Sequence, residues 1–216
     1  MIRSRPVSSV AVGLLVMLMA AQAWAGPPTE QLKGAVDRVV KALEDPVLKG
    51  DGRAAERRTT VRKIVNDIFD FAEIARRSLG RHWRARTDRE REEFVVLFSD
   101  LLERSYISKI DLYGGERIVY ATERIDGDTA TVGTRIVTKN GTEVPVDYRL
   151  LARGERWLVY DVSIEGVSLV SNYRTQFNKI IQTGGYPDLV KRLRSKQGEA
   201  ALGEGAPVGG KGASKR

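Results

Sequence analysis

Side chains suited to catalysis are few in this 216-residue chain, and they are scattered along it. Asp161 and Glu165 lie near the end of one predicted strand, and the single histidine, His82, lies between Arg81 and Trp83. Two carboxylates and an imidazole could carry out acid–base catalysis. The alternative is structural, because carboxylates at element ends pair with arginines or cap helices. We favour the structural role and predict no catalytic residue.

Other patterns that support chemistry are missing from the sequence. One histidine and no cysteine cannot supply the ligand set of a zinc site. There is no Gly-x-Ser-x-Gly nucleophile motif. The glycine pairs at 114–115 and 184–185 fit turns better than a phosphate-binding loop. The sequence therefore predicts no metal site and no cofactor.

Basic residues outnumber acidic ones, 36 to 28, which gives a formal net charge of +8. Five arginines cluster around Trp83, and the docking candidates among them are Arg76, Arg77, Arg81 and Arg84, with Arg86 as the fifth member. This cluster could dock on an anionic membrane surface or an acidic partner. The alternative is an ordinary solvated surface. No basic stripe alternates with exposed aromatic residues, so nucleic acid is not a predicted partner.

The first 25 residues have the pattern of a secretory signal peptide. Arg3 and Arg5 precede an apolar run over residues 10–21, and Ala23-Trp24-Ala25 fits a cleavage site. The alternative is a membrane anchor, but the run is shorter than the ~20 residues that a spanning helix needs. We predict cleavage after Ala25 and an exported, soluble protein.

The remaining chain is predicted to form one domain over residues 26–197, followed by a disordered tail over residues 198–216. The tail is rich in Gly, Ala, Ser and Lys and has no periodicity. In the first half of the domain, apolar residues recur at helical spacing in four segments. We expect these helices at Thr29–Leu43, Arg53–Asp67, Asp70–Gly80 and Thr87–Asp111.

Four strands are expected next, because the apolar residues alternate and short turn sequences separate the segments. The expected strands are Glu116–Ile125, Thr129–Thr138, Thr142–Arg153 and Arg156–Glu165. Tight turns between consecutive strands predict an antiparallel meander. Pro145 cannot donate a ladder hydrogen bond, so we expect an edge position or a bulge there.

The apolar period changes from two to helical spacing at Gly166. Ser168 can cap the helix that follows, which we expect to reach Gln182. The second glycine pair and Pro187 separate it from a last helix that includes Leu189. The expected fold class is α+β: N-terminal helices, a four-stranded antiparallel meander and two C-terminal helices.

One long run at this transition resembles the signature of a known family. The residues 161–177, DVSIEGVSLVSNYRTQF, preceded by RWLVY, resemble the MlaC-type phospholipid-binding proteins, also called the toluene-tolerance auxiliary family. The segment 69–83, FDFAEIARRSLGRHW, resembles the N-terminal half of the same family. The resemblance covers residues 30 to 195. It implies the same α+β layout, with helices on a curved sheet enclosing an apolar cavity.

The resemblance also implies a function. Such a protein is a periplasmic carrier that shuttles phospholipids between the outer and inner membranes as part of an ABC-type lipid transport system. The implied partners are a diacyl phospholipid, an inner-membrane ABC transporter complex and an outer-membrane lipid-handling protein. Three alternatives stay open: an enzyme acting on a lipid or other apolar substrate, a module that binds only proteins, and a carrier of polycyclic lipids of the hopanoid type.

Apolar stripes on the predicted strands and helices are the candidate lining of the cavity. Periodicity alone does not separate a lined cavity from a packed core, and without the resemblance a packed core is the simpler interpretation. With the resemblance, the candidate lining residues are Leu97, Leu101, Val144, Val146, Tyr148, Leu150, Leu158, Tyr160, Val162, Ile164, Leu169, Tyr173 and Phe177.

Overall fold

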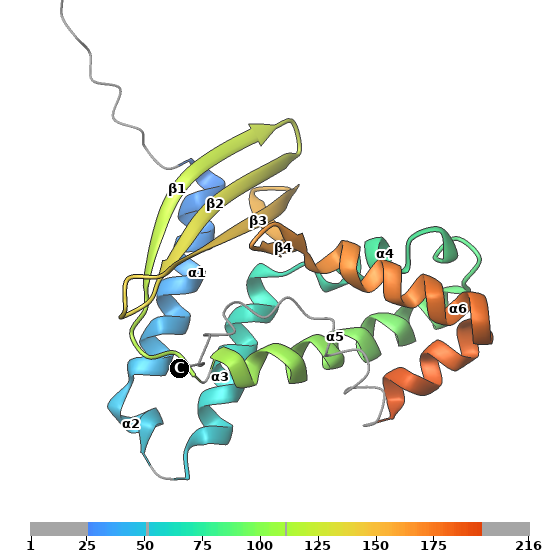
Figure 1. The fold of residues 1–216 in the computed structure, drawn as a ribbon, viewed down its shortest axis with the longest axis horizontal. Coiled ribbons are helices and arrows are strands. Elements are labelled where there is room, and N and C mark those ends of the chain that lie inside the picture. The colour runs from blue at the N-terminus through green and yellow to red at the C-terminus, as the bar shows by residue number, and fades with distance from the viewer. Residues whose placement is uncertain (1–25, 51, 111, 196–216) are drawn as a thin grey trace, which may run out of the picture.

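The computed structural model describes residues 26–195, apart from residues 51 and 111 (Figure 1). The predicted signal peptide, the predicted tail and the last two residues of the predicted domain lie outside the described residues. Within the described part of the chain, no helix has the length and apolar content needed to cross a membrane.

The helices agree with the expected ones to within two residues at most ends. Two short elements were not expected: the one-turn helix α2 and the 3₁₀ helix η1. The helices are α1 (Pro27–Glu44), α2 (Pro46–Lys49), α3 (Ala54–Ile68), α4 (Phe71–Leu79), η1 (Gly80–His82), α5 (Asp88–Ile110) and α6 (Leu169–Arg194).

The predicted caps are confirmed where the structure shows their hydrogen bonds. The Glu73 amide donates to the Asp70 carboxylate at 2.9 Å, which starts α4. At the start of α5, the Thr87 amide donates to the Glu90 carboxylate at 2.8 Å and the Glu90 amide donates to the Thr87 hydroxyl at 3.3 Å. This reciprocal pair is the expected capping box.

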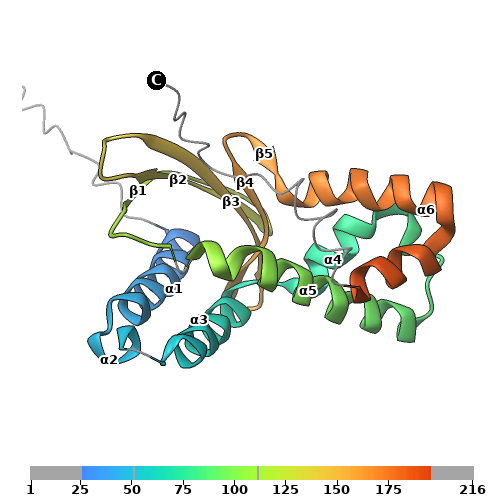
Figure 2. The ribbon, with the colours of Figure 1, turned by 60° about the horizontal axis from the view of Figure 1, so that its bottom comes forward.

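Helix α6 contains the two helices that the sequence predicts. Its backbone leaves the helical region at Gly185, where φ is 76° and ψ is 174°, and Pro187 follows two residues later. A positive φ favours glycine, and proline starts a new helical turn readily. The chain therefore turns sharply here, and the last helical segment folds back beside α5 (Figure 2).

The sheet has five antiparallel strands in the order β1-β2-β3-β4-β5, so the expected count of four is one too low. The strands are β1 (Arg117–Asp126), β2 (Thr129–Val137), β3 (Glu143–Arg153), β4 (Arg156–Ile164) and β5 (Val167–Ser168). The fifth strand is only two residues long and forms where the chain reverses at Glu165 and Gly166, both with positive φ. It was missed because so short a strand has no alternation to detect.

Pro145 lies in a central strand, but at a local edge. The last β3–β4 pair is Val146 with Ile164, and β4 turns away immediately afterwards. The Pro145 carbonyl accepts a hydrogen bond from the Glu165 amide at 3.0 Å. The Pro145 nitrogen, which carries no hydrogen, faces the turn. The predicted edge position is therefore correct with respect to β4, where pairing ends at Val146. With respect to β2, Pro145 lies within the paired region.

A bulge at Tyr160 divides β4 into two halves. Arg149 pairs with Asp161 and Leu150 pairs with Val159, so Tyr160 has no partner on β3. One extra residue moves the following side chains to the opposite face of the sheet. The alternation expected along the whole of β4 is therefore wrong, because the residues before and after Tyr160 are out of phase.

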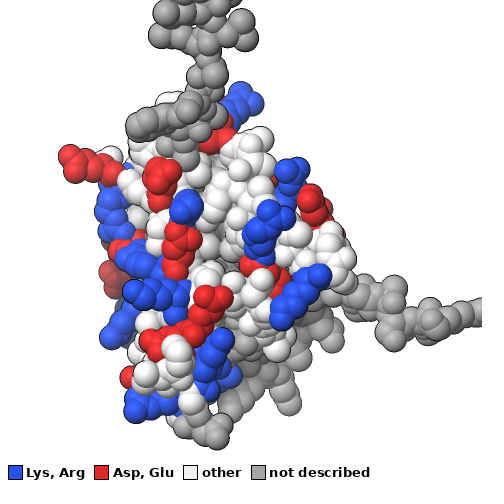
Figure 3. Space-filling model, turned by 90° about the vertical axis from the view of Figure 1, so that its left-hand side faces the viewer, with Lys and Arg blue, Asp and Glu red and all other residues white. Residues whose placement is uncertain are grey.

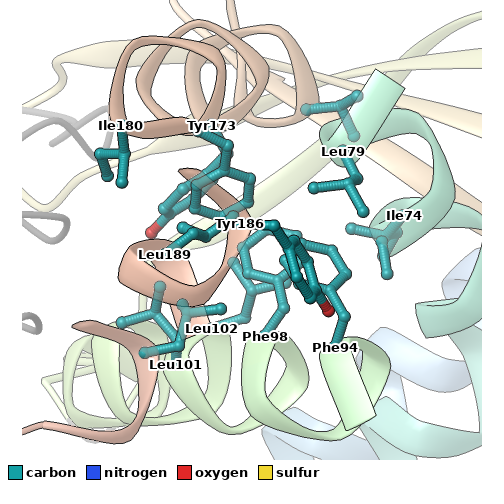
Figure 4. Close-up of a cluster of buried hydrophobic side chains, with 14 residues drawn as sticks. Ile74, Leu79, Phe94, Phe98, Leu101, Leu102, Tyr173, Ile180, Tyr186 and Leu189 are labelled. Carbon is teal, nitrogen blue, oxygen red and sulfur yellow. The ribbon is translucent and has the colours of Figure 1, made fainter. Parts of the chain in front are cut away.

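Helices α4, α5 and α6 form their own hydrophobic cluster beside the sheet. Phe94 and Phe98 of α5 meet Tyr173 and Phe177 of α6, with ring centroids 5.0 to 5.7 Å apart. Figure 4 shows Phe94, Phe98 and Tyr173 within this cluster. A second cluster joins the sheet to α1, where Leu32 is buried. Figures 1 and 2 show α4 and α6 extending away from the sheet, while α1 lies against it.

A buried carboxylate holds α4 to the sheet. Glu73 is 5% exposed and accepts hydrogen bonds from Arg76 at 2.8 Å and Arg77 at 2.7 Å. Arg153 of β3 lies 3.6 Å from Glu73 and 2.9 Å from Asp70. The Arg76 hydrogen bond, followed by that of Arg77, lowers the pKa of Glu73 to about 2.

This cluster gives an expected pH dependence. The folded-state pKa of Glu73 lies below its ordinary value of 4.5. Its contribution to stability is therefore complete above about pH 4.5 and is lost as the pH falls toward 2. We expect Glu73→Gln to lower the urea midpoint at pH 7 and to matter much less at pH 3. If Glu73→Gln lowered the urea midpoint by the same amount at pH 7 and at pH 3, this account would be contradicted.

Candidate functional site

The inner face of the sheet, which carries Val132 and Leu150, packs against α1 at one end. Val132, Leu150 and Val159 are fully buried and pack with Leu32 and Ala35 of α1. This half of the face is an ordinary hydrophobic core. It positions α1 against this end of the sheet.

At the other end, two cross-strand rows continue the inner face. In the first row, Ile136 pairs with Ile118 on β1 and with Val144 on β3. In the second row, Val146 pairs with Ile164 on β4. We call these five residues the apolar sheet end. Four of them are only half-buried, and none of the five packs in any of the three hydrophobic clusters of the described residues.

The polar groups of this face are neutral or already bonded. Burial raises the pKa of Tyr148 to about 12, and burial also raises the pKa of Tyr120. Both phenols are therefore uncharged at neutral pH. The carboxylate of Glu123 accepts from the Thr29 amide at 2.8 Å. The inner face thus presents a surface that suits an apolar ligand.

The candidate lining residues fall into different groups in the structure, rather than around one space. Val144, Val146 and Ile164 belong to the apolar sheet end. Tyr148, Leu150 and Val162 lie in the cluster between the sheet and α1. The remaining helical candidates and Tyr160 lie in or against the cluster of α4, α5 and α6: Leu97, Leu101, Leu169, Tyr173 and Phe177.

Leu158 does not share the inner face. It pairs with Leu151, which alternates with the inner residue Leu150 and so points to the opposite side. The bulge at Tyr160 is the cause. The expectation that Leu158 faces the same way as Val162 is therefore wrong, and the role of the other candidates in lining a cavity stays a prediction.

The three residues with potential for acid–base chemistry lie in separate environments. Asp161 is 3% exposed and accepts from the Val170 amide at 3.0 Å and the Ser168 hydroxyl at 2.6 Å. Its carboxylate therefore fixes the start of α6 to β4. Glu165 is exposed in the turn, and His82 Nε2 lies 3.0 Å from Asn178 Oδ1.

The arginine cluster also divides. Arg76 and Arg77 pair with buried Glu73, and the Arg77 guanidinium lies 4.0 Å from the centre of the Tyr160 ring. Arg81 and Arg84 are exposed. The first two have a structural role that the sequence did not reveal, and a docking role for the cluster stays a prediction.

Two hollows on the surface are lined by other residues. One of about 480 Å³ lies along the C-terminal part of α1, beside Asp37 and Glu44. One of about 380 Å³ lies between α5 and the end of α6, beside Glu93 and Lys191. Neither includes the apolar sheet end, so the enclosed cavity stays a prediction. No group of three or more potential metal ligands occurs among the described residues.

The family model of the MlaC protein matches residues 33–195, which is most of the chain. The chain belongs to the MlaC protein family. The family resemblance expected from residues 161–177 is therefore confirmed, and so is the α+β fold class.

Individual members of the family are similar over much of their length. The intermembrane phospholipid transport system binding protein MlaC of Haemophilus influenzae is 24% identical over 153 residues, which cover 67% of this chain and 70% of that protein. Toluene tolerance protein ttg2D of Pseudomonas putida is 28% identical over 141 residues, which cover 64% and 65%.

One solved structure shares the fold closely. The phospholipid-binding protein of Ralstonia solanacearum, solved in complex with a phospholipid, aligns with a TM-score of 0.71 and 28% identity. The alignment covers 82% of this chain and 99% of that one. The fold is thus common to this chain and to a protein solved with a bound phospholipid.

Sequence reasoning missed two members of the apolar sheet end, Ile118 and Ile136. Both lie in strands whose apolar residues alternate, so the signal was present. The missing information was the register, which aligns Ile118, Ile136 and Val144 in one cross-strand row. Cross-strand register depends on contacts between distant segments, which a single sequence does not display.

Proposed function

We propose that this chain is an exported carrier that binds a diacyl phospholipid and shields its acyl chains in transit between two membranes. The observation that carries the proposal is the apolar sheet end, which belongs to none of the three hydrophobic clusters of the described residues and in which four of the five side chains are half-buried. The lipid-bound relative with the same fold suggests the chemical class of the ligand that this surface takes.

The physical requirement for such a carrier is large. A diacyl lipid has roughly 30 methylenes, each worth about 0.8 kcal/mol on leaving water, or about 24 kcal/mol in total. A soluble carrier must offer an apolar surface that replaces the membrane interior. Acyl chains lying on the two rows of the apolar sheet end would exclude water from both surfaces at once.

The partners and the compartment follow from the same proposal. An N-terminal signal peptide would deliver the protein to the periplasm, and the carrier would exchange lipid with an outer-membrane lipid-handling protein and an inner-membrane ABC transporter complex. Binding and release need no covalent step. Asp161 then keeps its role at the start of α6, and neither Glu165 nor His82 has a catalytic role.

Removal of the lipid is expected to lower the melting temperature. A ligand that binds only the native state stabilises it by mass action, and an apolar surface exposed to water loses that support. The test compares protein as purified with protein stripped by organic extraction and refolding, and then with stripped protein reloaded with phospholipid. A melting temperature that is the same in all three preparations would argue against a lipid-binding role.

A further inference from the structure

One face of the molecule is built from two segments that lack acidic residues. Residues 74–87, from α4 to the start of α5, contain five arginines and no Asp or Glu. Residues 169–187, the first part of α6, contain Arg174 and Lys179 and no Asp or Glu. The complete chain has 28 acidic residues, so their absence from two segments that pack together sets this face apart.

Hydrogen bonds place the cations of the two segments side by side. Arg81 Nη2 donates to Asn178 Oδ1 at 2.7 Å, which joins η1 to α6. Arg174 Nε donates to the Arg77 carbonyl at 2.8 Å, which joins α6 to α4. The Arg174 side chain also passes beside Gly80. We call the surface carrying Arg81, Arg84 and Arg174 the basic face.

The partners of these arginines are unusual for this protein. Arginines elsewhere commonly lie within ion-pair distance of a carboxylate, as in Arg38–Asp67, Arg135–Glu143 and Arg192–Asp188. Within the described part of the chain, no carboxylate lies at that distance from Arg81, Arg84 or Arg174, and the acceptors of Arg81 and Arg174 are neutral oxygens. Their positive charge is therefore uncompensated.

The contrast with another face is visible directly. Figure 3 shows the left-hand side of Figure 1, where Lys and Arg side chains are interspersed with Asp and Glu. A mixed surface of this kind gives little net field. The basic face, by comparison, has the single sign of charge that attracts an anionic partner at long range.

We propose that the basic face docks an acidic segment of a protein partner. The proposal rests on the carrier function, since a carrier must meet a donor and an acceptor of lipid. It differs from the cluster expected from the sequence, because Arg76 and Arg77 are engaged by Glu73 and Arg174 takes their place.

Two observations favour a protein over a membrane surface as the partner. The exposed large apolar residues of the described chain are Val47, Val96, Leu112, Ile125 and Val167, and none lies in the two acid-free segments. A membrane-binding surface would combine cations with apolar side chains that insert. In addition, Arg81 and Arg174 are held in fixed orientations, which suits paired hydrogen bonds to individual carboxylates.

The test uses the full-length protein and immobilised poly-L-glutamate as the acidic probe. We expect the double variant Arg81→Gln/Arg174→Gln to bind the probe roughly tenfold more weakly than the wild type at low salt, with the difference shrinking as salt is added. The matched control is Arg117→Gln/Arg124→Gln, which removes the same charge from exposed positions on β1. The affinity of this control variant for poly-L-glutamate should fall by less than about twofold.

Each outcome bears on the proposal. An equal loss of affinity for poly-L-glutamate in both double variants would mean that only net charge matters, and it would overturn the proposal. Unchanged affinity in both variants would also overturn the proposal. Vesicles containing phosphatidylglycerol form a second arm, and a loss confined to those vesicles would assign the face to membranes instead. Lipid content is measured separately in every protein. If the wild type carries no lipid but the Arg81→Gln/Arg174→Gln variant still binds poly-L-glutamate more weakly than the control variant does, the carrier function is contradicted and the docking face is retained.

Discussion

Ile136→Glu is expected to remove nearly all bound lipid, whereas Val137→Glu leaves lipid occupancy unchanged. The two residues are neighbours on β2, and both are half-buried. Only Ile136 faces the inner side, between Ile118 and Val144. Protonating a glutamate of ordinary pKa at pH 7 costs about 3.7 kcal/mol, which weakens lipid binding by several hundredfold.

Native mass spectrometry of the two purified variants gives the lipid occupancy of each. Melting curves serve as the control, because both substitutions place a charge at a half-buried strand position and should destabilise the fold to a similar, modest extent. Equal lipid loss in both variants, or full occupancy in Ile136→Glu, would mean that the apolar sheet end does not contact the lipid.

Asp161→Ala is expected to cause the largest loss of stability among the single substitutions that the structure suggests. The change leaves the Val170 amide, which is buried at the start of α6, without its acceptor and removes the bond from Ser168. Losing charge-assisted hydrogen bonds while a buried donor is left without an acceptor lowers the free energy of unfolding by about 3 kcal/mol. In a domain of this size that corresponds to a melting temperature lower by roughly 6–12 °C.

Two further variants separate the cap from the charge. Asp161→Asn keeps one acceptor oxygen, so its loss should be intermediate. Glu165→Gln removes an exposed carboxylate four residues away and should change stability by less than about 0.5 kcal/mol. Thermal melting of the three proteins decides between the alternatives. A melting temperature of Asp161→Ala equal to that of Glu165→Gln would contradict the anchoring role of Asp161.

Local signals in the sequence were sufficient for most elements of this fold. The reciprocal pair at Thr87 and Glu90, the cap at Ser168 and the break at Gly185 each depend on residues within a few positions of one another. Such features follow from backbone chemistry, and a single sequence displays them. The family resemblance at residues 161–177 then supplied the kind of ligand.

The candidate site depends on information that no local pattern contains. The bulge at Tyr160 results from pairing with β3, and it moved Leu158 to the outer face. The structural role expected for Asp161 is confirmed, because its carboxylate bonds the start of α6, but its burial there was not predicted. For Leu158 and for Asp161 alike, contacts with another segment determined what the residue type alone does not show.

The division of the apolar residues into separate clusters has the same origin. Tyr173 and Leu150 both looked like inward-facing residues of one core. In the structure, the first packs with α5 and the second with α1. Amphipathic periodicity identifies the buried side of each element but does not identify the element that covers it.

The central claim is that the apolar sheet end is a lipid-binding surface, and the most direct test is native mass spectrometry of the wild-type protein after expression in bacteria and gentle purification. The account predicts that the chain carries bound phospholipid, roughly one molecule per chain or a small multiple, released by organic solvent and identified from the extract. A lipid-free wild-type protein that melts as a single stable species would contradict the account, because the half-buried rows of Ile118, Ile136 and Val144 would then be stable without any apolar ligand.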